Sequence, residues 1–361
     1  MVMTGNISSS VPVGSAVGIV GMGLIGGSLA RRLADRGCRV IAWNHRSHPY
    51  EQARRDGIAC VDTLADLVEG NPDVLVLCNP LKAMPDILAE LKPLLDIHPD
   101  IVLTDVGSVK GMVRAQVEAA GLGERYVGAH PMAGNELSGW NAADPHLYDD
   151  ALWAVTVDEH TEYRRFLAVA RLVVESVGNR MIVLDDDTHD RAAALISHMP
   201  HAVATALINE LVDSPVRNVA AALAAGSWRD MTRVALTDPE RTRAMIEEDS
   251  ANVETLLRGM AVRLNAMADQ LRDGDAAGLT DFFAAGQPFR DYKASKASRI
   301  PSEGAVADVG TSQCATDRSA RILEVPRHGW QHALLESALD GEHIVALCGE
   351  RKMLIRALSR L

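Results

Sequence analysis

The sequence predicts an α/β domain built on a doubly wound parallel sheet, then an all-α domain, then a small C-terminal α/β appendage. Three observations predict this order. Short apolar segments alternate with amphipathic ones, a glycine-rich turn follows the first apolar segment, and strand signals stop after Asp187. The 361 residues allow two or three domains. The formal net charge of −12 argues against a nucleic acid or an anionic membrane as partner, because clustered Lys and Arg bind both.

The first expected domain covers residues 16–186, after a loose tail over residues 1–15 that shows no hydrophobic period. Apolar segments are expected to form strands at residues 17–20, 39–43, 74–78, 101–104, 152–157 and 181–184. Amphipathic segments between them are expected to form helices at residues 24–36, 49–56, 84–95, 109–120 and 162–176. This alternation is typical of a mostly parallel sheet with helices on both faces.

The second expected domain, residues 187–297, is rich in alanine and is expected to be helical. Its longest helix is expected to begin near Asp238 and Pro239, which suit an N-cap and a first turn. Apolar residues then recur at steps of three and four and form one stripe: Val253, Leu256, Leu257, Met260, Leu264, Met267 and Leu271. Such a stripe packs inside its own domain or against a second copy of the chain, and the two options are not exclusive.

The C-terminal part is expected to consist of a linker over residues 298–319, rich in Ser, Gly, Ala and Asp, and an appendage over residues 320–361. The appendage is expected to have a β-α-β-α order, with strands at 322–325 and 343–347 and helices at 330–339 and 352–358.

The five cysteines are far apart and form no C-x-x-C motif, which favours reduced thiols in a cytoplasmic protein. An export signal begins with basic residues, and none precedes the apolar stretch over residues 17–30. This stretch is therefore not expected to be an export signal. It is also too short and too rich in glycine to span a bilayer.

Gly21, Gly23 and Gly26 form a G-x-G-x-x-G pattern between the first expected strand and the first expected helix. In that context Gly21 permits a tight turn, Gly23 lets a pyrophosphate approach the backbone, and Gly26 lets the helix pack close to the strand. Backbone N–H groups at the helix start, around Leu24 and Ile25, would face the phosphates. The pattern predicts a Rossmann domain that binds NAD or NADP.

The end of the second expected strand bears on the choice of cofactor. A carboxylate there would hold the ribose 2′-hydroxyl of NAD, but this sequence has Asn44. Arg46, with His45 and Ser47, suits a 2′-phosphate held by charge-assisted hydrogen bonds. The alternative is a solvated polar loop. The segment predicts a preference for NADP, with NAD also accepted.

Two segments of the first domain carry residues suited to chemistry. Ser108 follows the strand expected at 101–104, where it either caps a helix or lies at the cofactor edge of the sheet. His130 is followed by proline and by a glycine-rich loop that contains Glu136. That position suits a general base, although a lone histidine is more often structural.

His198 and His201 open the helical region and share a helix face, because they are three residues apart. A metal site would need one or two further ligands, and Asp187 and His189 are the only near candidates. No metal is therefore expected.

These segments together resemble the prephenate and arogenate dehydrogenase family of tyrosine biosynthesis. The resemblance covers about residues 16–290. It is carried by G-M-G-L-I-G-G-S-L-A, T-D-V-G-S-V-K-G, G-A-H-P-M-A-G-N-E-x-S-G, I-S-H-M-P-H-A-V-A and W-R-D-M-T-R. It implies a Rossmann domain, a helical dimerisation domain and an active site between them.

The implied reaction is the oxidative decarboxylation of prephenate to 4-hydroxyphenylpyruvate, with hydride transfer to NAD(P). An arogenate dehydrogenase that gives tyrosine directly is the first alternative, and a non-catalytic NADP-sensing protein is the second. A relative of the β-hydroxyacid dehydrogenases is disfavoured, because those enzymes use a lysine of the helical domain and residues 188–290 contain none.

The resemblance also implies roles for individual residues. His130 matches the catalytic base, Ser108 matches the serine that orients it, and Glu136 lies in a loop that closes or tunes the site. Four residues of the helical domain match substrate-binding positions: Arg233, which grips a carboxylate, His201 and His198, which shape the pocket, and Asp230, which orients Arg233 or a histidine.

Two features depart from the family pattern. Some relatives carry an aromatic residue shortly after the arginine, and residues 237–242 contain none. Some relatives end in a regulatory ACT domain with a β-α-β-β-α-β order, whereas residues 320–361 match at most a degenerate half of one.

Overall fold

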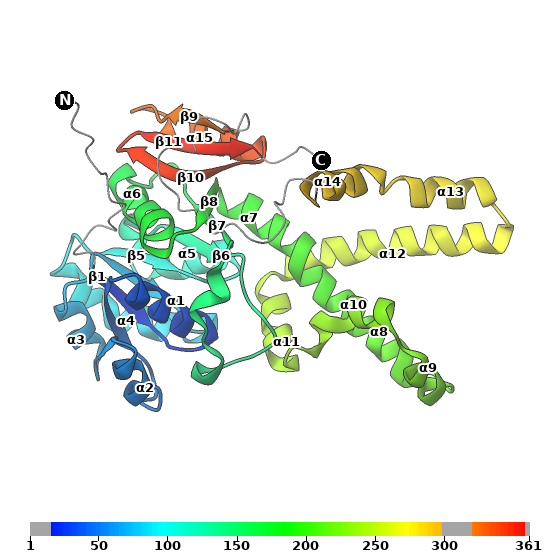
Figure 1. The fold of residues 1–361 in the computed structure, drawn as a ribbon, viewed down its shortest axis with the longest axis horizontal. Coiled ribbons are helices and arrows are strands. Elements are labelled where there is room, and N and C mark those ends of the chain that lie inside the picture. Colours follow the sequence, from blue (N-terminus) through cyan, green and yellow to red (C-terminus); the bar gives the residue numbers. More distant parts are fainter. Residues whose placement is uncertain (1–15, 298–319, 358–361) are drawn as a thin grey trace, which may run out of the picture. The chain divides into compact units, whose positions relative to one another are not determined.

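A computed structural model describes residues 16–297 and 320–357 (Figure 1). The described residues divide into two compact units. The first comprises residues up to Asp187 together with residues 320–357, and the second begins at Thr188. The expected tail over residues 1–15 and the expected linker over residues 298–319 lie outside the described residues.

The first unit contains a parallel sheet whose strands run in the order β3-β2-β1-β4-β5. Its strands are β1 (Ala16–Val20), β2 (Arg39–Trp43), β3 (Ala59–Cys60), β4 (Val74–Leu77) and β5 (Val102–Asp105). The connecting helices are α1 (Leu24–Asp35), α2 (Tyr50–Arg55), α3 (Leu64–Glu69), α4 (Met84–Asp96) and α5 (Lys110–Ala119). The order reverses between β1 and β4, which confirms the predicted Rossmann fold. In such folds ligands bind at the carboxyl ends of the strands beside the reversal.

A second, mixed sheet in the same unit has the order β6-β7-β8-β10-β11-β9. Its strands are β6 (Gly128–Pro131), β7 (Leu152–Thr156), β8 (Arg180–Leu184), β9 (Ala320–Glu324), β10 (Glu342–Gly349) and β11 (Lys352–Ala357). The strands expected at 152–157 and 181–184 therefore do not extend the parallel sheet. β6 runs antiparallel to β7, and β10 runs antiparallel to β8.

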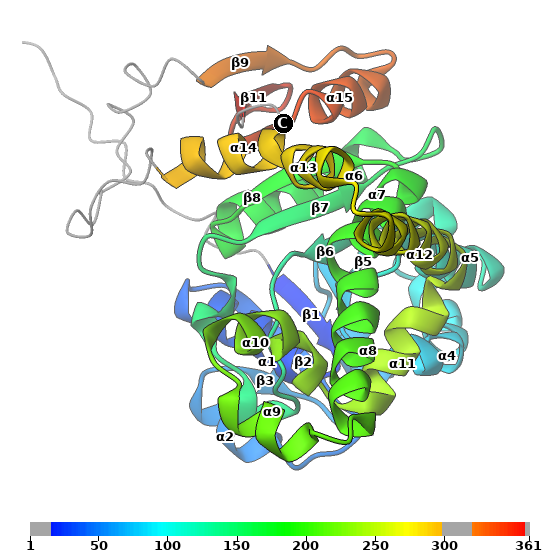
Figure 2. The ribbon, with the colours of Figure 1, turned by 90° about the vertical axis from the view of Figure 1, so that its right-hand side faces the viewer.

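The C-terminal strands are part of this second sheet, and β9 lies at its outer edge (Figure 2). α15 (Trp330–Leu339) packs on α6 (Tyr163–Arg171), where the Trp330 ring centroid lies 5.0 Å from that of Phe166 and 5.1 Å from that of Tyr163. The helix predicted at residues 352–358 is wrong, because this segment is strand β11. Its buried residues Met353 and Ile355 alternate with more exposed ones, and a short apolar run does not distinguish that period from a helical one.

The second unit is helical, as predicted. Its helices include α8 (Met199–Asp213), α9 (Arg217–Leu223), α10 (Gly226–Thr232), α11 (Pro239–Glu248), α12 (Ser250–Asp273), α13 (Ala276–Ala284) and α14 (Gln287–Ala297). α7 (Asp186–Ala193) leads into it from the first unit. Figure 1 shows α12 alongside α13, with the chain running in the opposite direction.

The prediction of one long helix from Asp238 is wrong, because the chain breaks at Asp249 between α11 and α12. Asp238 does cap α11, since its carboxylate accepts the Arg241 N–H at 3.0 Å. Within the apolar stripe Val253 is fully buried, but Leu264 is 53% exposed and Leu271 is 59% exposed. The described residues therefore leave Leu264 and Leu271, in the C-terminal part of the stripe, largely uncovered.

Within the described residues, no helix combines the length and the apolar character needed to cross a membrane.

Candidate functional site

The glycine turn between β1 and α1 has the geometry of a pyrophosphate cradle. Gly21 has φ +99°, and a Cβ there would lie 3.0 Å from the Cys78 carbonyl oxygen. A Cβ at Gly26 would lie 2.0 Å from the Gly21 carbonyl oxygen, so only glycine lets the helix pack against this turn. A Cβ at Gly23 would meet nothing within 4 Å, and no side chain caps α1. Open space thus faces an uncapped helix N-terminus, which suits a dinucleotide.

Asn44 joins this turn to the loop that follows β2. Its Oδ1 accepts the Met22 N–H at 2.8 Å, and its Nδ2 donates to the Arg46 carbonyl oxygen at 2.7 Å. Tyr50, which sequence reasoning missed, accepts the Asn44 N–H at 3.0 Å and donates to the Val61 carbonyl oxygen at 2.7 Å. The base of the loop is therefore fixed by hydrogen bonds.

The side chains at the tip of the same loop lie on the surface. His45, Arg46 and Ser47 are all exposed. Within the described part of the chain, the Arg46 guanidinium has no carboxylate partner. An anionic group on a bound nucleotide could reach it without breaking an ion pair.

Ser108 lies in the turn between β5 and α5, and it does not cap the helix. Val109 occupies the N-cap position, and no side chain caps α5. His130 lies half-buried on β6. The two segments are joined by the buried Lys110, whose Nζ donates to the Ala129 carbonyl oxygen at 2.8 Å. The structure thus links the turn of Ser108 to the strand of His130.

Sequence reasoning did not assign a role to Lys110 or to its partner Asp105. The Lys110 ammonium forms an ion pair with the Asp105 carboxylate, and both side chains are completely buried. The signal was present, because T-D-V-G-S-V-K-G contains both residues. A buried charged pair in a short loop motif is unusual enough to indicate a specific role.

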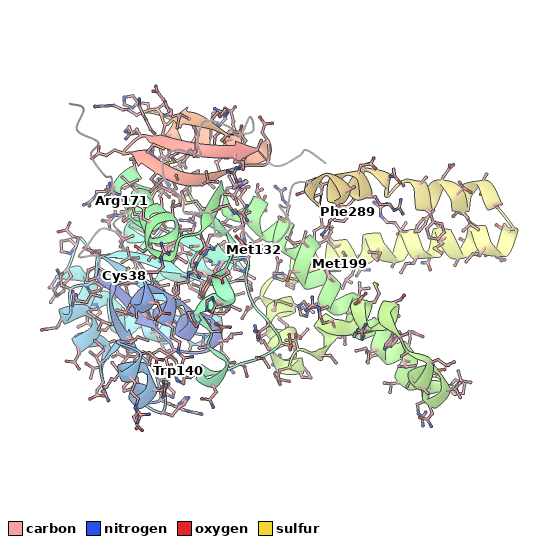
Figure 3. The ribbon with its side chains drawn as sticks, viewed as in Figure 1. Cys38, Met132, Trp140, Arg171, Met199 and Phe289 are labelled. Atoms are coloured by element: carbon pink, nitrogen blue, oxygen red, sulfur yellow. The ribbon has the colours of Figure 1, made fainter. Side chains whose placement is uncertain are left out.

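Glu136 lies on the loop that follows β6. Met132, labelled in Figure 3, is the first residue of this loop. The Glu136 side chain is exposed. Near it, the Asn135 side chain accepts the Leu137 N–H at 2.9 Å and gives this part of the loop a local turn.

In the second unit, His198 ends a π-helical turn (Ala194–His198) directly before α8. Its Nδ1 lies 2.8 Å from Asp249 Oδ2, and the exposed fractions of the two side chains are 1% and 4%. Asp249 was not singled out from the sequence. π-helical turns occur frequently at functional sites, which agrees with the role expected for this segment.

His201 is half-buried on α8, and the pKa of its imidazole is lowered. Burial is the largest cause, followed by the nearby positive groups of His198, Arg241 and Arg233. A hydrogen bond to the Val234 backbone acts in the opposite direction. His201 therefore favours its neutral form and has two arginines in its electrostatic surroundings.

Arg233 begins a 3-10 turn (Arg233–Leu236) that packs against α8. It is exposed, and no carboxylate within the described residues pairs with it. Asp230 is also exposed, and the structure does not bring it into an ion pair with Arg233 or with a histidine of the described region. Arg233, Arg241 and His201 form a local group of nitrogen donors that suits an anionic ligand.

In the part of the chain that the structure describes, no group of three or more His, Cys, Asp or Glu side chains is placed to hold a metal ion.

Two family models match the chain, one for each unit. Residues 29–183 match the nucleotide-binding domain of prephenate dehydrogenase. Residues 185–285 match the dimerization domain of prephenate dehydrogenase. Together they include Ser108, His130 and the histidines and arginines of the second unit, and the first match begins at residue 29, after the glycine turn.

Individual relatives agree with these matches. The chain is 27% identical over 278 residues to the prephenate dehydrogenase of Lactococcus lactis, which covers 75% of each chain. A structure of A. aeolicus prephenate dehydrogenase with hydroxyphenyl propionate and NAD+ is similar with a TM-score of 0.69 and 29% identity, over 76% of this chain and 97% of that one. Synechocystis arogenate dehydrogenase is similar with a TM-score of 0.66 and 28% identity, over 76% and 99% of the two chains.

Proposed function

Because the chain belongs to the prephenate and arogenate dehydrogenase family, we propose that it converts prephenate to 4-hydroxyphenylpyruvate and carbon dioxide. The observation that carries the proposal is the match of both units, in order, to the two domains of prephenate dehydrogenase. The cradle at Gly23 and the nitrogen donors near Arg233 agree with it, because the reaction needs a dinucleotide and an anionic substrate.

In the proposed reaction, His130 takes the proton of the substrate hydroxyl while hydride leaves the ring carbon that bears this hydroxyl. A bound nicotinamide cofactor supplies the hydride acceptor. The ring carboxylate departs as carbon dioxide, and the electron pair of the broken C–C bond completes the aromatic ring. The ring oxygen then takes a proton back and becomes a phenol. Ser108 orients the hydroxyl and His130.

Substrate binding falls to the second unit in this proposal. The Arg233 guanidinium has a planar fork that matches a carboxylate, and it has no carboxylate partner within the described residues. His201, held neutral by its surroundings, is able to donate one hydrogen bond and to accept another. Arg241 adds a second positive charge near His201. Glu136 and His198 keep the roles expected from the family resemblance, whereas Asp230, which pairs with neither Arg233 nor a histidine of the described residues, is assigned no role here.

The cofactor is a nicotinamide dinucleotide, and we assign it as NADP in preference to NAD. The support is the amide of Asn44 in place of a carboxylate, together with the exposed guanidinium of Arg46. His45 and Ser47 beside it offer further hydrogen-bond donors. The A. aeolicus relative was solved with NAD+, so use of NAD also agrees with the family.

Arogenate is the second candidate substrate, because the chain is also similar to Synechocystis arogenate dehydrogenase. The two substrates differ in a keto or an amino group on the side chain, far from the site of hydride transfer. The same residues would serve either reaction.

The second unit carries the dimerization domain of the family. We propose a homodimer in which a second copy covers the exposed part of the stripe on α12, where Leu264 and Leu271 lie. We also propose that the enzyme works in the cytoplasm. The described cysteines are free thiols, which agrees with a reducing compartment.

An absorbance assay of reduced nicotinamide tests the proposal directly. Prephenate and arogenate are each offered with NAD and with NADP, and the product is identified by chromatography. We expect the highest kcat/KM with prephenate and NADP, and 4-hydroxyphenylpyruvate as the product. Dinucleotide binding without oxidation of either substrate would overturn the proposal in favour of a sensing protein.

A further inference from the structure

The Asp105 carboxylate ends β5 in a completely buried position and accepts four hydrogen bonds. Oδ1 accepts the Tyr126 hydroxyl at 2.8 Å and the Ala129 N–H at 3.1 Å. Oδ2 accepts the Gly107 N–H at 2.8 Å and also bonds to the Lys110 ammonium. Four donors fill the lone-pair sites of a carboxylate, so this buried charge is fully satisfied.

Lys110 connects the Asp105 carboxylate to the backbone of β6. Its Nζ bonds to Asp105 and donates to the Ala129 carbonyl oxygen at 2.8 Å, and its side chain has no exposed area. Strand β6 lies close to the Lys110 side chain at Gly128. A Cβ at Gly128 would lie 2.3 Å from Thr156 Oγ1 and 3.3 Å from the Lys110 side chain. Only glycine at position 128 allows this approach.

Ala129 is therefore held by two side chains instead of a neighbouring strand. β6 is the edge strand of the second sheet and pairs with β7 on one side only. On its other side, the N–H of Ala129 bonds to Asp105 and the C=O bonds to Lys110. The next residue along β6 is His130.

A buried ion pair is weak support for stability, because the cost of removing both charges from water offsets their attraction. The positions of Asp105 and Lys110 indicate a different use. They flank the turn that carries Ser108, and both form hydrogen bonds with Ala129, the residue before His130. One charged pair thus fixes the two segments that hold the proposed base and its orienting serine.

We propose that Lys110 and Asp105 are positioning residues for the dehydrogenase reaction, acting through Ala129 on His130. The expected loss of rate rests on the proposed function, whereas the expected loosening of β6 does not. Displacement of a catalytic group by about 1 Å costs about 100-fold in rate, so loss of the clamp is expected to lower kcat by roughly 10- to 100-fold.

The first experiment compares four full-length variants in the prephenate assay: Lys110→Met, His130→Asn, the double variant of the two, and Lys92→Met as matched control. Lys92 forms an exposed ion pair with Asp96 on α4. We expect Lys110→Met to lower kcat, with KM for prephenate and Kd for the dinucleotide changed by less than about threefold. Because Lys110 acts through His130, the double variant is expected to be no slower than His130→Asn. Additive losses would overturn the proposal.

The second experiment needs no activity. Hydrogen exchange followed by mass spectrometry is measured on the wild type, on Lys110→Met and on Asp105→Asn/Lys110→Met, which removes both charges and keeps an oxygen acceptor for Ala129. We expect faster exchange over residues 126–131 in both variants and unchanged exchange in β1 and β4. Unchanged protection of β6 would overturn the clamp. A wild type inactive on both substrates would overturn the proposed function alone.

Discussion

His198 Nδ1 lies 2.8 Å from Asp249 Oδ2, with both side chains buried, although the two residues are 51 positions apart in the chain. Asp249 also accepts a hydrogen bond from Asn252 Nδ2 at 2.8 Å. Because a carboxylate only accepts, the contact places a proton on Nδ1 of the imidazole. Asp249 also lies at the break between α11 and α12, so the residue that separates the two helices is the one that contacts His198.

Replacement of Asp249 is expected to destabilise the second unit. In Asp249→Ala the buried imidazole loses its partner, which costs about 2–3 kcal/mol for a hydrogen bond to a charged group. Asp249→Asn keeps an oxygen acceptor and is expected to cost about half as much. The free energy of unfolding in urea measures both. Asp269→Ala, which breaks an exposed pair with Arg272, is the matched control and is expected to change stability by less than about 0.5 kcal/mol. Equal losses in Asp249→Ala and Asp269→Ala would contradict the prediction.

His130→Asn tests the proposed base. Asparagine is close to histidine in size but does not take up a proton at neutral pH, so kcat is expected to fall by at least about 100-fold. The dinucleotide Kd and the melting temperature are expected to stay near those of the wild type, because β6 is held through Ala129. Single-turnover kinetics and dinucleotide titration measure these quantities. Near-normal turnover would remove His130 from the mechanism.

Arg233→Ala tests the proposed carboxylate contact. Because a charge-assisted hydrogen bond contributes about 1.5–3 kcal/mol, KM for prephenate is expected to rise by roughly 10- to 100-fold, with a smaller change in kcat. Arg217→Ala, on the exposed start of α9, is the control for removal of a surface guanidinium and is expected to leave KM unchanged. If kcat fell at constant KM, Arg233 would act only in the transition state.

Arg46→Ala tests the preference for NADP. Loss of a contact to the 2′-phosphate is expected to raise KM for NADP by about tenfold or more and to change KM for NAD by less than about twofold. Arg55→Ala on α2, which removes an exposed arginine paired with Glu51, serves as control. An unaltered KM for NADP would show that Arg46 does not select the cofactor.

The parts of this fold that the sequence predicted depend on local pattern. Three glycines close together in the chain suffice to predict the cradle at Gly21, Gly23 and Gly26, although part of the crowding that requires them comes from Cys78. His130 and Arg233 were singled out because they lie in short family motifs. In each case the informative residues are neighbours in the chain.

The parts that were missed depend on contacts between distant segments. Lys110 bonds to a carbonyl 19 positions away, so its role follows only from the path of β6. The residue at the break, Asp249, contacts His198, which lies 51 positions away, and the apolar stripe that follows the break gave no sign of it. The strand at Lys352–Ala357 was mistaken for a helix because its pairing with β10 and β9, and not its composition, determines its conformation.

The lowered pKa of His201 predicts the direction in which stability depends on pH. The pKa of the His201 imidazole is 6.5 in the unfolded chain and lower in the folded chain, so the folded chain binds this proton more weakly. As pH falls below 6.5, the unfolded state takes up this proton first, and the free energy of unfolding decreases. Above 6.5 both states are neutral at this position, and no such effect remains. His201→Gln is therefore expected to lose less stability than the wild type between about pH 7.5 and about pH 5.5, measured by urea unfolding.

His146 provides a control of opposite sign. Its pKa is raised, first by the hydrogen bond to Asp149 and then by the charge of that carboxylate, so its contribution is present below 6.5 and is lost as pH rises. His146→Gln is expected to lose slightly more stability than the wild type on acidification, and the difference should shrink in high salt because the pair is exposed. If His201→Gln and the wild type lost stability equally between the two pH values, the charge of His201 would not be coupled to folding, and its neutral form could not be attributed to burial beside His198, Arg241 and Arg233.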